Sequence, residues 1–182
     1  MIDLNVNEDF FNINLFSNDV PYSKMIKCSY DIFLQDMSKR PNKKTRKIFE
    51  KIAHYFLNEL SLGAPAPRIK KEWGYKQFLI YICTNGKYYV AGVIGITKLE
   101  QRFKNMWTIE WVWIHPFLRK KGILKTVVEL LEKKYGELAI YEIMTLEMEC
   151  FARHYKKNNV SYHYRYGITR DNIKKVLRNK LK

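Results

Sequence analysis

Alternation of apolar and polar residues divides the first third of the chain into one strand and two helices. Residues 10–16 alternate strictly, as a half-buried strand does. Apolar side chains recur at helical spacing over 23–37, after which Pro41 breaks the pattern, and again over 45–62, where Gly63 follows. The pattern therefore predicts a strand over 10–16 and helices over 23–37 and 45–62.

The middle of the chain predicts three consecutive strands. Residues 77–83 and 87–96 are apolar on both faces and flank Asn85-Gly86, a pair that suits a type I′ hairpin turn. A third apolar run covers 106–114. Since strands that are apolar on both faces need a cover on both sides, we expect a sheet with helices on both faces.

The last third alternates again between helix and strand. Helical spacing over 120–135 ends at Gly136, and the pattern predicts a strand over 138–144 and a helix over 145–157. A strand over 142–148 fits the same residues equally well, so this boundary stays open.

Beyond these elements the pattern predicts a strand over 160–166 and a basic helix over about 168–182. The order of elements is typical of a mixed α/β fold on a single sheet. We see no domain boundary, so we expect one domain over 1–182 with its core over 77–160.

Composition excludes several classes of protein. Of the 182 residues, 47% are hydrophobic and 15% aromatic, which excludes a disordered chain. No apolar run reaches the roughly 18 residues of a membrane span, and the acidic start lacks the features of a secretory signal. The cysteines, Cys28, Cys83 and Cys150, show neither disulfide nor zinc-site spacing. We expect a cytoplasmic protein with no metal and no membrane contact.

The charge is uneven along the chain. Thirty-three Lys and Arg against 18 Asp and Glu give a net charge of +15, and the excess gathers in residues 39–51 and 153–182. A basic surface of this size attracts polyanions such as nucleic acid, an acidic protein or a phosphorylated cofactor. A solvated lysine-rich face is the alternative interpretation.

Residues 114–124 combine the features of a phosphate-binding turn. An apolar strand ends at His115-Pro116, a basic turn follows, and Gly122 opens a helix. Helix N-termini leave backbone N–H groups unpaired and carry partial positive charge, and glycine lets a ligand approach the backbone closely. The segment can therefore hold a pyrophosphate. Four side chains add charge around it: Arg119, Lys120, Lys121 and Lys125.

This segment resembles motif A of the GNAT superfamily of acyl-CoA-dependent N-acetyltransferases. The motif is a strand ending in V-x-P and then R/Q-x-x-G-x-G/A, and the matching residues are Ile114-His115-Pro116 and Arg119-x-x-Gly122-x-Leu124. Leu124 replaces the usual Gly or Ala, which tightens the approach to the cofactor. The later run Tyr155-Lys156-Lys157-Asn158-Asn159-Val160 is similar to the family's Y-E-K-x-G-F.

The resemblance implies a GNAT-like fold, mostly antiparallel with helices on both faces, and acetyl-CoA as the acetyl donor. Main-chain groups of Val112, Trp113 and Ile114 would pair with the pantetheine arm. Tyr155 would be the general acid. The amides that would hold the pyrophosphate belong to Arg119, Lys120, Lys121, Gly122, Ile123 and Leu124. The basic C-terminal helix departs from the family's usual final hairpin strand.

The general base stays open. Glu110 lies on the motif-A strand and could reach the cleft directly or through water, and an ordinary paired carboxylate is the alternative. In lysine-acetylating relatives the acidic residue aligns nearer to Thr108, on the same face of the strand. Glu147 is a further candidate if 142–148 is a strand.

The function we expect is N-acetyl transfer by direct attack of a primary amine on the thioester. The acceptor would be a protein lysine, an N-terminus, a small amine or the amino group of an aminoacyl-tRNA. The alternative is a catalytically weak GNAT-fold module that binds nucleic acid through residues 39–51 and the C-terminal helix. Whether the protein is a homodimer stays open.

Overall fold

The computed structural model describes residues 25–29, 31–39, 41–60, 68–69, 74–84, 86–99, 106–140 and 146–155. The strands predicted over 10–16 and 160–166 and the basic helix predicted over 168–182 lie outside these residues.

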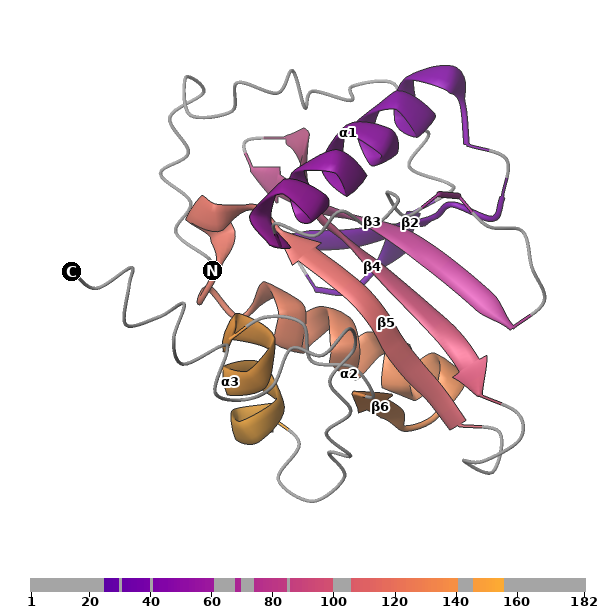
Figure 1. Cartoon of the computed structure of the whole chain (residues 1–182). Helices are drawn as coiled ribbons and strands as arrows, with labels where there is room; N and C mark the ends of the chain where they lie inside the picture. Colours follow the sequence, from indigo (N-terminus) through magenta and orange to yellow (C-terminus); the bar gives the residue numbers. More distant parts are fainter. Residues whose placement is uncertain are drawn as a thin grey trace.

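The described residues form six strands, three α-helices and one short 3₁₀ helix (Figure 1). In chain order these are β1 (Met25–Lys27), β2 (Ile32–Asp36), α1 (Lys43–Leu60), β3 (Tyr75–Thr84), β4 (Lys87–Leu99), β5 (Met106–Ile114), the 3₁₀ helix η3 (Pro116–Leu118), α2 (Ile123–Tyr135), β6 (Leu138–Ile140) and α3 (Leu146–Tyr155).

All six strands belong to one sheet, in the order β1-β2-β3-β4-β5-β6. Every neighbouring pair is antiparallel except β5 and β6, which are parallel and joined through α2. The predicted mixed α/β sheet is therefore confirmed. The predicted hairpin is confirmed as well, because Thr84 pairs with Lys87 and Gly86 has a φ of +73° at the turn.

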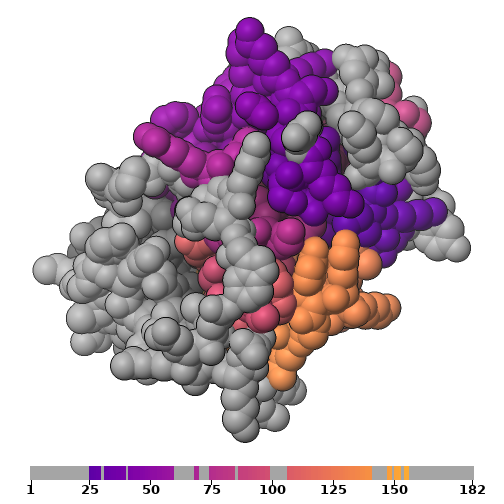
Figure 2. All heavy atoms as spheres, turned by 90° about the vertical axis from the view of Figure 1, so that its right-hand side faces the viewer, coloured from indigo at the N-terminus to yellow at the C-terminus, as the bar shows by residue number. Residues whose placement is uncertain are grey.

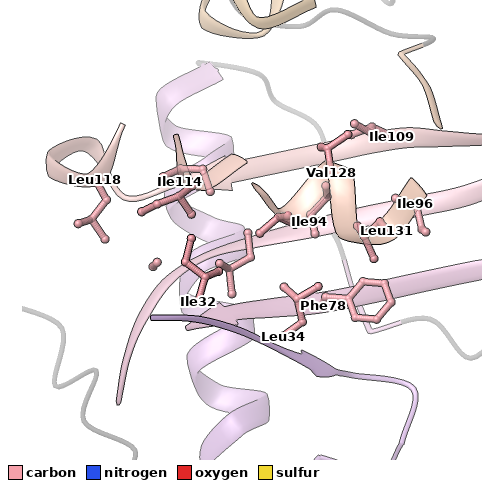
Figure 3. Close-up of a cluster of buried hydrophobic side chains, with 14 of the residues drawn as sticks. Ile32, Leu34, Phe78, Ile94, Ile96, Ile109, Ile114, Leu118, Val128 and Leu131 are labelled. Carbon is pink, nitrogen blue, oxygen red and sulfur yellow. The ribbon is translucent and has the colours of Figure 1, made fainter. Parts of the chain in front are cut away.

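Hydrophobic side chains fill both faces of the sheet. On one face, α2 and α3 cover a cluster that draws on β2 to β6 (Figure 3). On the other face, α1 covers a second cluster that includes Trp111 and Trp113. In the side view the atoms of α1 lie above the strands and those of α2 below (Figure 2). The expected cover on both faces is thus confirmed, and we call the two sides the α1 face and the α2 face.

The helix predicted over 23–37 is wrong, because these residues contain the hairpin strands β1 and β2. All five side chains of β2 are buried, with Ile32 and Leu34 on the α2 face and Phe33 on the α1 face. Apolar residues on both sides of a short strand have a spacing that also suits a helix. Residues 32–36 form a strand because they pair with β3.

The helix predicted over 45–62 is confirmed as α1, which begins two residues earlier. The side chain of Asn42 accepts a 2.8 Å hydrogen bond from the amide of Thr45, and this N-cap fixes the start. The alternative strand over 142–148 is wrong for Leu146–Met148, because these residues begin α3.

Candidate active site

The turn between η3 and α2 has an unusual backbone. Lys120 and Gly122 adopt left-handed conformations, with φ of +62° and +78°, whereas the φ of Arg119 is −68°. A positive φ is uncommon outside glycine, so Lys120 and Gly122 mark a sharp change of backbone direction just before α2. We call residues 120–124 the cradle.

The cradle opens α2 without satisfying its first amides. No side chain caps the helix at Gly122, and its first turn holds no acidic residue. The first hydrogen bond of the helix runs from the Thr126 amide to the Gly122 carbonyl. Among the described residues, none accepts a hydrogen bond from the amides of 120–125. The partial positive charge of the helix end therefore stays available to an anion.

Space lies over the cradle. A Cβ built on Gly122 would meet no atom within 4 Å. The side chain of Leu124, which departs from the motif, packs against the hydrophobic cluster of the α2 face. Its side chain therefore contributes to the core, and its amide stays at the start of the helix.

Arg119 is tied to the scaffold. Its amide donates to the Pro116 carbonyl (3.2 Å) and its Nε to the Ile114 carbonyl (2.9 Å). Its Nη2 forms a 2.6 Å ion pair with Glu59 at the end of α1. Glu59 also accepts a 3.1 Å hydrogen bond from the indole of Trp113. The guanidinium thus braces the turn against α1, and the Arg119 amide already has an acceptor.

The outer edge of β5 has a described partner only over its first half. β5 and β6 pair from Trp107–Leu138 to Ile109–Ile140, and no described residue pairs with that edge beyond Ile109. The His115 amide donates to the Ala91 carbonyl on β4. Since N–H groups alternate along a strand, those of Val112 and Ile114 point to this outer edge, whereas that of Trp113 points to β4.

Glu110 occupies a β-bulge. Gly95 of β4 lies opposite Trp111 and Ile96 lies opposite Ile109, so Glu110 is the extra residue. Ile109 faces α2, whereas Trp111 faces α1. The hydroxyl of Tyr75, which accepts a hydrogen bond from Trp111, also hydrogen-bonds to Glu110. The bulge therefore turns Glu110 to the α1 face.

Thr108 and Glu147 mark the other two positions considered for the general base. The hydroxyl of Thr108 is buried and has no hydrogen-bond partner among the described residues. Glu147 lies exposed in the first turn of α3, so the strand on which its candidacy depended is absent there.

Tyr155 ends α3 on the α2 face. Its ring stacks on Phe151 at 5.1 Å, and its hydroxyl lies 3.2 Å from the carboxylate of Glu132. Burial, and then the charges of Glu132 and Glu129, raise the pKa of Tyr155 to about 12. The phenol is therefore neutral at physiological pH and can donate a proton. Glu110 and Tyr155 thus lie on opposite faces of the sheet and make no contact with each other.

Helix α2 runs back along β5, because Tyr135 at the end of α2 packs on Trp107 at the start of β5. At 1.5 Å per residue, Glu132, the partner of Tyr155, lies about 15 Å along α2 from Gly122. At 3.3 Å per residue, Glu110 lies about 13 Å along β5 from Ile114.

His115 and Phe117 border the turn. The ring of His115 is buried, stacks on Phe117 at 5.6 Å and meets Trp113 edge-on at 5.7 Å. Burial, and then the charge of Arg119, lower the pKa of His115. His115 is therefore neutral at physiological pH and is held between two aromatic rings.

Metal and membrane features were also sought in the described part of the chain. There, no three His, Cys, Asp or Glu side chains form a group that could hold a metal ion. None of its helices is long and apolar enough to span a membrane.

The fold and the motif agree with one protein family. A model of the acetyltransferase (GNAT) family matches residues 44–159, which is more than half of the chain. The chain belongs to this family. It is therefore an acyltransferase, and the resemblance noted in motif A is confirmed. No curated protein sequence matches this GNAT acetyltransferase.

Solved acetyltransferases share its fold. The xEco2 acetyltransferase domain is 16% identical with a TM-score of 0.55, over 80% of this chain and 97% of that one. The same domain bound to a CoA conjugate is 19% identical with a TM-score of 0.54, over 76% and 99%. An aminoglycoside acetyltransferase from an uncultured soil metagenomic sample, in complex with sisomicin, is 12% identical with a TM-score of 0.50, over 76% and 97%. These likenesses establish the fold.

Three side chains of this acetyltransferase site were not predicted: Glu59, Tyr75 and Glu132. Glu59 meets Trp113 and Arg119, which lie 54 and 60 residues away in sequence. Tyr75 meets Trp111 across 36 residues. No local motif marks such pairs, because only the closure of the sheet brings them together.

Proposed function

We propose that this acetyltransferase transfers an acetyl group from acetyl-CoA to a primary amine by direct attack. The observation that carries the proposal is the start of α2, where uncapped and unneutralised amides follow a strand whose Val112 and Ile114 amides point away from β4. This arrangement fits a ligand with a pyrophosphate followed by a chain of amides.

The amides of the cradle would hold the pyrophosphate, with Lys120, Lys121 and Lys125 adding charge. Main-chain groups of Val112 and Ile114 would pair with the pantetheine arm. Trp113 and the amide of Arg119, which the sequence also suggested, have other partners, and we leave them out of the proposed contacts. Acetyl-CoA supplies an acetyl group activated as a thioester. A structure of the same fold that holds a CoA conjugate supports this choice.

Glu110 would be the general base and Tyr155 the general acid. The carboxylate of Glu110 accepts the proton of the acceptor ammonium from the α1 face. The neutral phenol of Tyr155 holds a proton for the leaving thiolate on the α2 face. Each group would thus work from one side of the sheet, with the reacting atoms near the outer edge of β5.

The acceptor in this proposal is an amine carried by a polyanion, with the amino group of an aminoacyl-tRNA as the leading case. The exposed side of α1 supports it, because its first half presents basic side chains: Lys43, Lys44, Arg46, Lys47 and Lys51. With the net charge of +15, this surface attracts phosphates. A protein lysine, a protein N-terminus and a small amine remain as competing acceptors.

We also propose a cytoplasmic location. Its support is the state of the cysteines, since Cys28, Cys83 and Cys150 are all free thiols.

The test is an acetyl-transfer assay with three acceptor pools. Acetyl-CoA labelled in the acetyl group is incubated with bulk aminoacyl-tRNA, with lysine-rich protein, and with a set of small amines. We expect label on the tRNA pool, lost when the tRNA is deacylated first. Label on another pool would overturn the acceptor. No label on any pool, together with salt-sensitive RNA binding, would favour the alternative of a nucleic-acid-binding module.

A further inference from the structure

We infer that Tyr75 is a positioning residue, whose hydroxyl holds the carboxylate of Glu110 at the bulge of β5. The inference rests on the proposed function, in which Glu110 is the general base. Tyr75 lies at the start of β3, far in sequence from motif A, and no feature of that motif points to it.

The hydrogen bonds of Tyr75 fix the direction of its proton. Its oxygen accepts from the Trp111 indole at 3.1 Å and from the Gln77 side-chain amide at 3.2 Å. A phenol oxygen has one proton to give, and both nitrogens are donors only. The proton of Tyr75 is therefore directed to its third neighbour, the carboxylate of Glu110.

The partners of Tyr75 are themselves held in place. The Gln77 side-chain nitrogen also donates to the Arg68 carbonyl at 2.9 Å. The Trp111 indole packs against Phe49 and Phe56 of α1, at ring distances of 5.7 and 5.3 Å. Tyr75 is only 4% exposed, so water does not compete for its hydroxyl. The phenol is thus a rigid donor.

The backbone is shaped to admit this cluster. A Cβ on Gly95 would lie 2.4 Å from the indole nitrogen of Trp111 and 3.2 Å from the Tyr75 hydroxyl. Opposite Gly95, the bulge brings Glu110 and Trp111 to the same face, so that one hydroxyl can reach both. Glycine and bulge together create a polar site within a sheet face that is mainly hydrophobic.

The consequence for the reaction is orientation. A carboxylate offers about four lone-pair positions, and the bond from Tyr75 occupies one of them. It therefore fixes the orientation of the Glu110 side chain. Burial, and then the charge of Glu110, raise the pKa of Tyr75, so the phenol stays a donor and does not compete as a base.

The first test needs no acceptor. In the free protein, the indole N–H resonances of Trp111 and Trp113 are compared between wild type and Glu110→Gln. We expect the Trp111 resonance to shift, because loss of the carboxylate charge changes the polarisation of the Tyr75 hydroxyl that accepts its proton. The Trp113 indole, which donates to Glu59, is the internal control and should not shift. An unmoved Trp111 resonance would overturn the inference.

The second test is a double-mutant cycle on kcat, with the acceptor pool that takes the label. Tyr75→Phe should lower kcat roughly ten- to a hundredfold through misplacement of the base, with the Kd for acetyl-CoA unchanged. In the Glu110→Gln background it should lower kcat no further. Tyr81→Phe is the matched control, since it removes one buried hydroxyl of the same strand, bonded to Gln35 at 2.8 Å. It should leave kcat unchanged.

The outcomes separate the inference from the function on which it rests. If Glu110→Gln keeps wild-type kcat, Glu110 is not the general base. If no acceptor pool takes label, the proposed reaction does not occur. Either result would also overturn the inference about Tyr75. Alternatively, Glu110→Gln lowers kcat while Tyr75→Phe lowers it by the same factor in wild type and in the Glu110→Gln background. That result would overturn the positioning role of Tyr75 and leave Glu110 as the base. Wild-type kcat in Tyr75→Phe would overturn the positioning role in the same way.

Discussion

The hydroxyl of Tyr155 donates a 3.2 Å hydrogen bond to Glu132, whose second carboxylate oxygen accepts the amide of Leu138 at 3.2 Å. One carboxylate thus joins the end of α3, the last turns of α2 and the first residue of β6. It holds the proposed acid near the start of β6, where Leu138 pairs with Trp107 of β5.

Tyr155→Phe should lower kcat at least a hundredfold and leave the Kd for acetyl-CoA unchanged, because only the proton donor is lost. Rapid-quench measurement of acetyl transfer and a calorimetric titration give the two values. Tyr135→Phe is a fair control, since that ring also packs on the α2 face and has no proposed catalytic role. Normal turnover by Tyr155→Phe would remove Tyr155 as the acid.

Acid should destabilise the protein partly through His115. Because its pKa in the folded state is lowered, this side chain binds fewer protons than it does in the unfolded chain, where the pKa is 6.5. Its contribution to stability is full above pH 6.5 and is lost as the pH falls below that value. Urea unfolding from pH 7.5 to 5 should therefore show a shallower loss of stability in His115→Gln than in wild type.

The exposed His54 of α1 offers the comparison for that measurement. His54→Gln removes an exposed imidazole by the same substitution and is measured in parallel. An identical slope for His115→Gln and wild type would contradict the argument from burial.

Gly95→Ala should destabilise the protein by about 1–3 kcal/mol through overpacking. The new Cβ would lie 2.4 Å from Nε1 and 2.6 Å from Cδ1 of Trp111, so the indole must leave the Tyr75 hydroxyl. In a Trp111→Phe background the same change should cost less, because the smaller ring frees that space. The loss of unfolding free energy is measured by chemical denaturation in both backgrounds. Equal losses would show that the contact with Trp111 is not the reason why position 95 requires glycine.

Local patterns predicted much of the fold. The Asn85-Gly86 hairpin, α1 and the strand over 106–114 each depend on signals within a few residues, such as turn preferences, a cap or an apolar run. The helix predicted over 23–37 failed because two short strands, buried on both faces, have an apolar spacing that also suits a helix. Only the long-range pairing of β2 with β3 distinguishes them.

The candidate site, like the fold, could be predicted from local sequence only in part. The cradle was predictable because Arg119, Gly122 and Leu124 stand at motif spacing in one segment. The bulge at Glu110 was not, since 106–114 is an apolar run without a turn signal and the bulge arises from its register with Gly95. The partners of Glu110 and Tyr155 come from β3 and α2, which only the folded sheet brings near.

The central claim is that the start of α2 binds acetyl-CoA. The most direct measurement is a calorimetric titration of wild type, Gly122→Glu and Gly136→Glu with acetyl-CoA. The two glycines make a matched pair, because both have positive φ, border α2 and have open space around a new Cβ. Gly122 lies in the left-handed region (φ +78°, ψ −4°), whereas Gly136 (φ +87°, ψ −176°) lies in a region that is essentially restricted to glycine. Backbone strain is therefore at least as large in Gly136→Glu as in Gly122→Glu, and binding by Gly136→Glu would show that strain alone does not abolish it. We predict equal binding by wild type and Gly136→Glu and none by Gly122→Glu. Undiminished binding by Gly122→Glu, or no binding by wild type, would contradict the account.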